Sequence, residues 1–424
     1  MKSWAKWIIL FSLFIMAIIN FADKSILGLA GIHITKDLDL TSTQFGLLGS
    51  SFFWLFSLFG IIGGYLSDRF GTFKLLAIMA IIWTIAQSMA LFASSLPILI
   101  FSRLLLGAGE GAFLATAISH ISKWFKPESR GFAISIINFG NVVGIAVAAP
   151  IIVLLISNYG WRQAFFISGL FSFVWFIGWL WLGRMKPTDS FKEEQVDKME
   201  NKNEKNRKDV WKALRSPIFI ITTLVAFIAY SIIVFGLTFN PSYLVKVKGL
   251  SEQQSATVIA ISGLIGAILS IVLSIISDGL YKKTQSLWKS RILFTAVCVL
   301  LAGIFYSLYP ILNGSGSIII VLALVNALVI TVNTLNPAVV VSILPQRKGI
   351  MTGTYFGIMT SSGIITPIIF GKLIQDSGAD PAGGYSIAIY GMAIAMAIAA
   401  IIIFLFGSRK QQVPTDNDNK LVNL

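Results

Sequence analysis

Apolar residues gather in twelve long blocks along the 424-residue chain, with short polar stretches between them. Most blocks approach the roughly 20 residues that a helix needs to cross the hydrocarbon core of a bilayer. Barrel strands would be shorter and would alternate in polarity. We therefore predict an all-α integral membrane protein with spans at Trp7–Asn20, Phe45–Leu66, Leu75–Phe92, Ile98–Ile118, Ile134–Ile156, Ala164–Leu182, Ile218–Phe239, Ala256–Ile276, Ile292–Leu312, Ser317–Ile343, Met351–Ile369 and Ile387–Phe406.

The first block is short, and we expect its helix to continue through Asp23 to about Gly31. It has basic flanks but no small-residue cleavage site, which indicates a retained helix and not a cleaved signal peptide. Composition supports the membrane assignment, because only 12% of the residues are charged. Soluble domains carry about 25%.

Basic residues lie mostly on one predicted side of the membrane. With the N-terminus in the cytoplasm, 26 of the 33 Lys and Arg residues face the cytoplasm, five face outward and two lie within helices. This positive-inside bias predicts a plasma-membrane protein with both termini in the cytoplasm. The net charge of +14 is therefore a topology signal, and we expect no nucleic-acid partner.

The sequence lacks the residue patterns of a disulfide-linked protein, a metalloprotein and an ATP-driven pump. The single Cys298 excludes an intrachain disulfide and fits a small buried residue. His33 and His120 are far apart in the chain and form no recognisable metal site. No G-x-x-x-x-G-K-[ST] loop for ATP occurs. We expect no enzyme, no cofactor and no metal ion, and any uphill transport must be driven by a gradient.

The longest polar stretch, Lys186–Ser216, divides the chain into two sets of six helices. We expect a short amphipathic helix within it, around Val210–Leu214. The predicted organisation is an N-terminal membrane domain over 1–185, a cytoplasmic linker over 186–216, a C-terminal membrane domain over 217–408 and a cytoplasmic tail over 409–424.

The two halves repeat each other. Ser67–Asp68 recurs 210 residues later as Ser277–Asp278, and the residues Pro127, Arg130 and Gly131 recur 218 residues later as Pro345, Lys348 and Gly349. A parallel repeat of six helices is typical of secondary transporters whose site lies between two domains near the membrane midplane.

The segment Gly64–Lys74 (GYLSDRFGTFK) resembles the loop signature between helices 2 and 3 of the major facilitator superfamily, and Asp278–Lys283 is similar to its degenerate copy. The resemblance covers the whole chain in length and layout. It implies a monomer of two pseudo-symmetric six-helix domains that rock about a central site. At a helix end, Asp68 can pair with a basic residue of a neighbouring helix and latch the cytoplasmic face. We assign this gating role to Asp68, Arg69, Gly71 and Asp278.

Four charged residues lie clearly within predicted spans: Asp23, Lys24, Arg103 and Glu110. Charges at membrane depth are costly, so these residues are functional candidates. Arg103 and Glu110 are seven residues apart, which puts them on one helix face two turns apart. They could share a partner on the first helix. Gly107 and Gly111 would let another helix approach closely at this level.

A carboxyl next to a cation can couple an anion to a proton. A low-dielectric cavity disfavours the charged form of the carboxyl, and a nearby cation opposes that effect. If an anionic substrate captures the cation, the carboxyl loses its counter-charge and takes up a proton. Anion and proton then bind cooperatively, as a symporter requires.

Two segments resemble the anion:cation symporter branch of the superfamily, which includes carriers of hexuronates, galactonate and aromatic acids, sialin and the vesicular glutamate transporters. Asn20–Ser25 is similar to that branch's N-Y-x-D-R segment, and Arg103–Ala112 to its R-x-x-x-G-x-x-E segment. The resemblance implies proton coupling at Asp23 and Glu110. It also implies that Arg103 balances the glutamate and senses substrate, and that Lys24 holds the substrate carboxylate.

Two departures from the branch bear on the substrate. Lys24 stands where Arg is usual and cannot form a bidentate fork, and Thr360 stands where Asn is frequent. We expect uptake of a small organic anion with H⁺, with a sugar acid or another carboxylate as the substrate. Candidate neutral contacts are Asn141 and Thr360, which match the branch's contact positions, followed by Asn138, Asn333, Tyr355 and Ser361, and by Tyr230, Asn240 and Asn336.

Three alternatives stay open. A drug or metabolite exporter of the same fold would have an acidic cavity without matched cations. A membrane sensor would need a signalling domain, and neither the linker nor the tail is long enough for one. Coupling to Na⁺ in place of H⁺ is the third alternative, which transport with and without a sodium gradient decides.

Overall fold

The computed structural model describes residues 4–185, 205–378 and 380–406. Twelve helical segments in this part of the chain are long and apolar enough to cross a membrane, which confirms the predicted number of spans. The predicted tail and residues 186–204 of the predicted linker lie outside the described residues. The protein is a multi-pass helical membrane protein.

The N-terminal half supplies six of these spans and one short helix, α2 (Gly31–Asp37). Two spans are built from consecutive helices with a single break, and the others are continuous. The spans are α1 (Ala5–Leu29), α3 (Ser42–Phe70), α4 (Thr72–Ser88) with η1 (Met89–Phe92), α5 (Leu96–Gly111) with α6 (Phe113–Ile121), α7 (Pro127–Tyr159) and α8 (Trp161–Leu182).

The C-terminal half follows α9 (Lys205–Leu214), which covers the short helix expected in the linker, and it includes the short helix α11 (Asn240–Lys246). Its spans are α10 (Pro217–Thr238), α12 (Glu252–Thr284), η3 (Trp288–Leu293) with α13 (Phe294–Leu308) and η4 (Tyr309–Ile311), α14 (Ser315–Ile343), η5 (Pro345–Arg347) with α15 (Lys348–Thr360) and α16 (Ser362–Asp376), and α17 (Pro381–Phe406).

Local structure repeats between the halves at the spacing seen in the sequence. Thr41 forms a capping box with Gln44 at the start of α3, and 210 residues later Ser251 forms one with Gln254 at the start of α12. Such a box satisfies two backbone donors that a helix start otherwise leaves free. The first long helix of each half, α1 or α10, is also followed by a seven-residue helix.

Glycines bring the helices of the N-terminal half into close contact. A Cβ atom on Gly107 of α5 would lie 2.0 Å from the carbonyl oxygen of Phe52 on α3, and one on Gly111 would lie 2.4 Å from that of Phe56. This confirms that the two glycines admit a neighbouring helix, and it identifies that helix as α3. In the same way Gly140 of α7 admits the backbone of α1.

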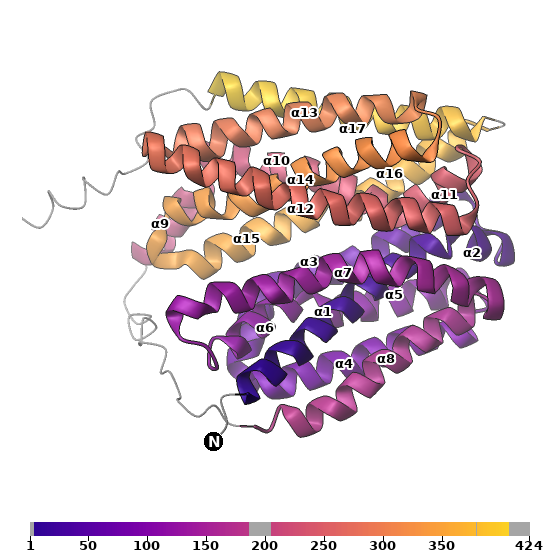
Figure 1. Cartoon of the computed structure of the whole chain (residues 1–424), viewed down its shortest axis with the longest axis horizontal. Helices are drawn as coiled ribbons and strands as arrows, with labels where there is room; N and C mark the ends of the chain where they lie inside the picture. Colours follow the sequence, from indigo (N-terminus) through magenta and orange to yellow (C-terminus); the bar gives the residue numbers. More distant parts are fainter. Residues whose placement is uncertain (1–3, 186–204, 379, 407–424) are drawn as a thin grey trace, which may run out of the picture.

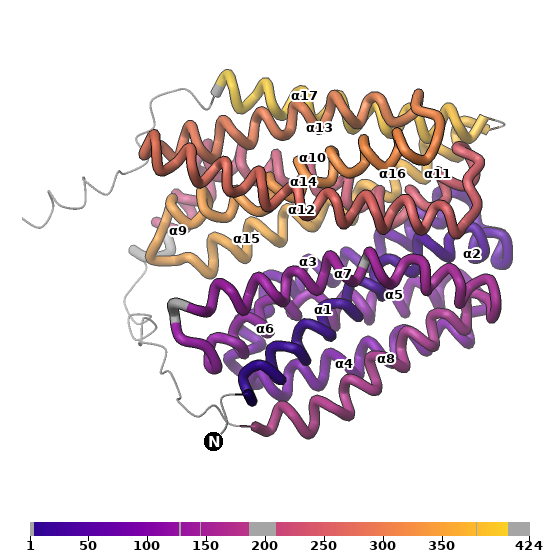
Figure 2. Tube along the Cα trace, in the orientation of Figure 1, coloured from indigo at the N-terminus to yellow at the C-terminus, as the bar shows by residue number. Residues whose placement is uncertain are grey.

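The two halves lie against each other most closely at the end that carries α2 and α11, opposite α9 (Figures 1 and 2). A Cβ on Gly371 of α16 would lie 2.4 Å from the carbonyl oxygen of Ser42 on α3, and one on Gly46 would lie 2.2 Å from that of Pro367. Towards the α9 end the contact loosens, since a Cβ on Gly353 of α15 meets its nearest atom only at 3.6 Å and one on Gly349 meets none within 4 Å.

Hydrogen bonds between the halves follow the same distribution. His33 Nε2 of α2 lies 3.0 Å from each carboxylate oxygen of Glu252, in the first turn of α12. The backbone N–H of Thr43 donates to Gln375 Oε1 at 3.2 Å. We call the contacts of His33 with Glu252 and of Thr43 with Gln375 the α2-end gate.

Candidate functional site

Helix α1 carries three of its polar residues close together in a mainly apolar span. Asn20, Asp23 and Lys24 are spaced so that their side chains share one side of the helix. Asp23 has no exposure to solvent, and the Lys24 side chain is 9% exposed. The position of α1 is set by α7, because the Cβ position of Gly144 lies 2.7 Å from the carbonyl oxygen of Ile18.

Lys24 pairs with Glu110 of α5. Its Nζ lies 3.2 Å from Glu110 Oε2 and donates to Asn20 Oδ1 at 2.6 Å. The ammonium also lies 4.6 Å from the ring centroid of Phe21 and 4.7 Å from that of Phe56. Within the described residues no hydrogen bond reaches either Glu110 oxygen, and the side chain is fully buried. The ion pair with Lys24 is thus what compensates the buried carboxylate.

Arg103 and Asp23 form a second group deeper in the N-terminal half. Arg103 donates to Gln87 Oε1 at 2.6 Å and to the main-chain oxygen of Asp23 at 3.5 Å, and its guanidinium lies 5.0 Å from the Phe165 ring centroid. The Asp23 carboxylate accepts a hydrogen bond from the Ser168 hydroxyl. Its other oxygen has no hydrogen-bond partner in the described part of the chain.

Arg103 and Glu110 form no direct ion pair among the described residues, and both contact helix α1, as expected: Glu110 through Lys24 and Arg103 through the main-chain oxygen of Asp23. Glu110 is paired with Lys24, whereas Arg103 is held by Gln87. The two residues stand two turns apart on α5, or about 10 Å along the axis. That distance is beyond the reach of a direct ion pair, so a lysine from α1 takes the place next to the glutamate.

Lys24 and Arg103 both line a cavity of about 20 Å³. This is room for about one water molecule. Leu237 and Thr238 of α10 close it from the C-terminal half. The two halves touch here, because a Cβ on Gly28 of α1 would lie 2.0 Å from the carbonyl oxygen of Leu237. The two cations therefore face a small space at the boundary between the halves.

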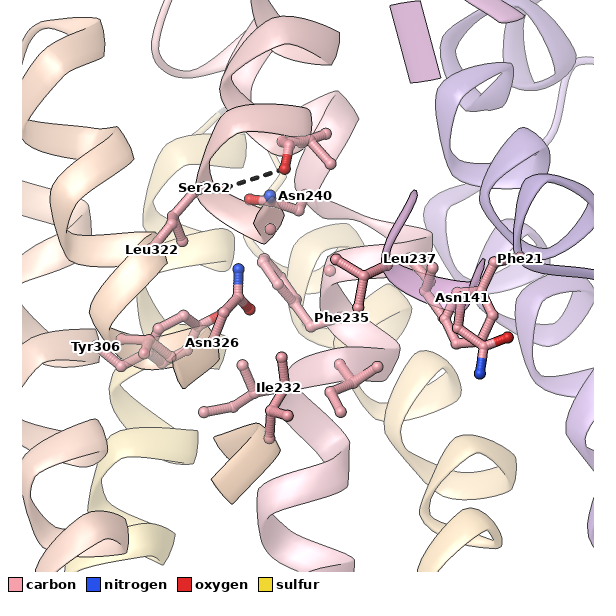
Figure 3. A pocket seen from close by; sticks show the side chains of 17 residues that line it. Phe21, Asn141, Ile232, Phe235, Leu237, Asn240, Ser262, Tyr306, Leu322 and Asn326 are labelled. Atoms are coloured by element: carbon pink, nitrogen blue, oxygen red, sulfur yellow. Dashed lines mark hydrogen bonds between the residues drawn. The ribbon is translucent and has the colours of Figure 1, made fainter. Parts of the chain in front are cut away.

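A larger cavity of about 270 Å³ adjoins this boundary (Figure 3). Its walls come from α1 and α7 of the N-terminal half and from α10, α11, α12, α13 and α14 of the C-terminal half. Leu237 lines both cavities. The polar residues in its walls are Asn141, Asn240, Ser262, Tyr306 and Asn326.

Asn141 and Asn240 are the predicted neutral contact residues that line the larger cavity, and Asn141 Oδ1 is buried without a hydrogen-bond partner among the described residues. Thr360 instead joins the halves by donating to Ser57 Oγ at 2.9 Å. Ser361 donates to the carbonyl oxygen of Ile358 on its own helix.

The remaining neutral candidates lie away from the walls of both cavities. Asn138 is exposed, and Asn333 is partly buried with its Oδ1 unpartnered among the described residues. Tyr355 is completely buried against Phe219 and Met351. A substrate role for these three residues and for Thr360 and Ser361 stays a prediction.

The predicted gating residues lie at the α9 end. Asp68 and Arg69 are exposed at the end of α3, and Arg69 donates to Tyr65 of the preceding turn. Gly71 has φ +76° and ψ 141°, a conformation open essentially to glycine, and it separates α3 from α4.

In the second half the corresponding aspartate, Asp278, is paired within its own half. Arg291 contacts Asp278 Oδ1 at 2.5 Å and donates to Ser277 Oγ at 2.7 Å. In the described part of the chain no ion pair of Asp68 is present. The partner expected for Asp68 is thus not brought to it in this conformation.

Sequence reasoning missed several residues of the site. Gln87 and Ser168, which hold Arg103 and Asp23, were hidden because a single amide or hydroxyl in an apolar block is equally typical of an ordinary interhelical hydrogen bond. Asn326 and Tyr306 were missed for the same reason. The sequence shows only that these residues are polar and lie within predicted spans. That does not distinguish a residue of the site from one that forms an ordinary interhelical hydrogen bond.

Residues 13–367 match the family model described as Major Facilitator Superfamily. The chain is 30% identical over 380 residues to the hexuronate transporter of Bacillus subtilis, with 88% of each chain covered. It is 27% identical to the probable sulfoacetate transporter SauU of Cupriavidus necator, with 86% of each chain covered. It is 26% identical to the D-galactonate transporter of Escherichia coli, with 96% of each covered.

Solved structures show the same fold at low sequence identity. A bacterial homologue of the human lysosomal transporter Spinster, in an inward-facing and occupied conformation, has a TM-score of 0.75 at 19% identity and covers 96% of this chain and 97% of its own. A D-xylose–proton symporter has a TM-score of 0.74 at 14% identity, with 94% and 97% covered.

Proposed function

This chain belongs to the major facilitator superfamily, and from that premise we propose that it takes up a small organic anion together with protons across the plasma membrane. It is a membrane transporter and not an enzyme. Similar transporters are named for hexuronate, galactonate and sulfoacetate, which share a negatively charged group. That shared feature supports an organic anion as substrate, with a sugar acid or another carboxylate as the candidates.

The observation that carries the proposal is the buried pair of Lys24 and Glu110, 3.2 Å apart. A substrate carboxylate that approaches from the small cavity meets Lys24 and Arg103. When Lys24 turns to the substrate, Glu110 is left buried without its cation, and binding a proton removes the uncompensated charge. Substrate and proton then enter together and leave together.

Asp23 has a supporting role in the proposed proton coupling. It lies next to Lys24 in the chain, and one of its oxygens is buried without a partner among the described residues. Ser168 holds the other oxygen. We assign it to proton transfer with Glu110, while Asn141 contacts the substrate from the larger cavity.

Transport then proceeds by alternating access of the two halves, 1–185 and 217–408, around this site. With both termini in the cytoplasm, the α2-end gate faces outward, and the conformation described is closed to the outside. Asp68, Arg69, Gly71 and Asp278 lie at the opposite, cytoplasmic end, where Asp68 would latch the halves in the other conformation and Asp278 is paired with Arg291 of its own half. The carrier works as a monomer, since each chain contains both halves and the site.

Uptake into proteoliposomes tests the proposal. Purified protein is reconstituted, an inward proton gradient is imposed, and accumulation of radiolabelled glucuronate, galactonate, sulfoacetate and cyclohexanecarboxylate is measured against protein-free vesicles. The proposal predicts accumulation of at least one anion that an uncoupler abolishes. Accumulation that requires a sodium gradient would contradict proton coupling, and ethidium efflux without anion uptake would identify an exporter.

A further inference from the structure

The larger cavity has an apolar character that sets it apart from the charged group beside it. Ten of the 17 residues in its walls have hydrocarbon side chains, and no charged residue is among the described residues that line it. In Figure 3, Tyr306, Leu322 and Asn326 lie on one side, and Phe21 and Asn141 lie on the other. A ligand that occupies this space is surrounded mainly by hydrocarbon.

Some polar groups in the walls of the larger cavity already form hydrogen bonds within the protein. Asn240 Oδ1 accepts a hydrogen bond from Tyr309 at 2.6 Å, and Ser262 donates to the carbonyl oxygen of Ile259 at 3.2 Å. What remains is the amides of Asn141 and Asn326, the amide nitrogen of Asn240 and the hydroxyl of Tyr306. Tyr306 is 1% exposed, and its hydroxyl has no hydrogen-bond partner within the described residues. The cavity therefore offers a ligand few hydrogen bonds.

The apolar cavity and the cations are immediate neighbours. Leu237 lines both cavities, and the Phe21 ring forms part of the larger cavity while its centroid lies 4.6 Å from Lys24 Nζ. A ligand can thus have a carboxylate near Lys24 and Arg103 and its body in the larger cavity. A ligand that fits both environments has a charged end and an apolar end.

We propose that the substrate is a small monocarboxylate whose body is mostly hydrocarbon, with at most a few hydrogen-bonding groups. This inference rests on the proposed anion transport and selects within it. The cavity volume of about 270 Å³ lies below the roughly 300–1,000 Å³ of pockets that hold drug-sized ligands, so it suits a smaller ligand. A polyhydroxylated sugar acid would bury hydroxyl groups for which these walls offer too few partners, which is costly.

A matched pair of ligands tests the inference. Cyclohexanecarboxylate and glucuronate both have a carboxylate on a six-membered ring, but only glucuronate carries hydroxyl groups. Their affinities for the purified full-length protein are measured by isothermal titration calorimetry at neutral pH. Binding is preferred to uptake here, because an apolar acid in its neutral form can cross lipid without a carrier. We expect cyclohexanecarboxylate to bind about tenfold or more tightly than glucuronate.

A cavity-filling variant tests the location. Gly236 lines the cavity, and a Cβ added there meets no atom within 4 Å, so Gly236→Leu fills the cavity without a backbone clash. We expect this variant to bind cyclohexanecarboxylate about tenfold or more weakly. Gly391→Leu is the control, because Gly391 is an exposed helix residue with equally open surroundings, and its affinity should equal that of the wild type.

Each result decides the inference separately from the proposed function. Glucuronate binding more tightly than cyclohexanecarboxylate would overturn the apolar substrate and leave anion transport standing. Equal affinity in Gly236→Leu and Gly391→Leu would overturn the cavity as the site of the ligand body. Binding of cyclohexanecarboxamide as tight as that of the acid would overturn anion recognition itself, and so would the absence of binding by every carboxylate in the uptake series.

Discussion

At the scale of single residues, the two buried carboxyls of the N-terminal half have different surroundings. Glu110 faces the cation of Lys24, and Asp23 faces the hydroxyl of Ser168. A carboxylate compensated by a movable cation responds to whatever removes that cation, whereas a hydroxyl partner is fixed. This difference leads us to couple substrate to proton at Glu110 and to give Asp23 the supporting role.

Neutral variants of the two acids separate transport from coupling. Glu110→Gln and Asp23→Asn keep the shape of the side chain but cannot bind and release a proton. We expect both to lose proton-driven accumulation in proteoliposomes, with exchange of labelled for unlabelled substrate retained. Asp39→Asn is the matched control, since Asp39 is exposed and its φ of 49° is one that Asn also adopts. Full accumulation in both variants would contradict the coupling mechanism.

Removal of the cation tests substrate recognition. We expect Lys24→Ala to weaken carboxylate binding by about 10- to 100-fold, because hydrogen bonds to charged groups contribute about 1.5–3 kcal/mol. Lys24→Arg keeps the charge and should restore much of the affinity. Titration calorimetry with the carboxylate that binds the wild type measures both. An unchanged affinity in Lys24→Ala would remove Lys24 from the binding site.

The four charged residues could be predicted from the sequence, but their pairing could not. Charge at membrane depth marks Asp23, Lys24, Arg103 and Glu110 regardless of fold. Which cation reaches Glu110 depends on the rotation and depth of α1, and the glycines of α7 determine both through close packing. The contacts between α1 and α7 join residues more than a hundred positions apart, so they cannot be predicted from the local spacing of residues.

At the scale of helices, the charged group depends on the contact between α3 and α5. Gly107 admits the backbone of α3, and the same face of α5 carries Arg103 and Glu110. A side chain at this glycine would push α3 outward. The spacing of the charged residues relative to α1 would change with it.

A stability measurement tests this packing. We expect Gly107→Ala to lower the free energy of unfolding by about 1–3 kcal/mol, as overpacking in a tight contact does. The control is Gly279→Ala in α12, where an added Cβ meets no atom within 4 Å. Thermal unfolding of the purified proteins compares the two. A melting temperature of Gly107→Ala equal to or above that of Gly279→Ala would contradict the packing.

The number of spans could be predicted from the lengths of the apolar blocks, but the breaks within the helices could not. The fourth span is interrupted at Ala112 and the eleventh at Ser361, between α15 and α16. Neither position carries a proline. The larger cavity could not be predicted from the sequence either, because its walls come from seven helices of both halves. Such features arise from tertiary packing and leave no periodic signal.

At the scale of the whole molecule, the halves meet at the α2 end and separate towards α9. Contacts of α3 with α16 close the first end, and the exposed Asp68 and Arg69 mark the second. A carrier that alternates between two openings must break the α2-end gate in every cycle. The gate is therefore the contact whose permanent closure should stop transport.

A cross-link tests the gate. Thr43 and Gln375 contact each other across the halves, and the buried Cys298 can first be replaced by Ala. We expect Thr43→Cys with Gln375→Cys, joined by a short thiol cross-linker, to lose uptake and to regain it when a cleavable linker is reduced. Each single-cysteine variant treated with the same reagent is the control. Full uptake in the cross-linked double variant would contradict alternating access at this gate.

The central claim is that an anion displaces Lys24 from Glu110 and that Glu110 then binds a proton. Calorimetric titration at pH 7 in two buffers of different ionisation enthalpy measures the protons taken up with each anion, using the tightest-binding carboxylate of the series. We predict uptake of about one proton per anion by the wild type and by Asp39→Asn, and about none by Glu110→Gln. Tight anion binding by the wild type with no proton uptake would contradict the claim.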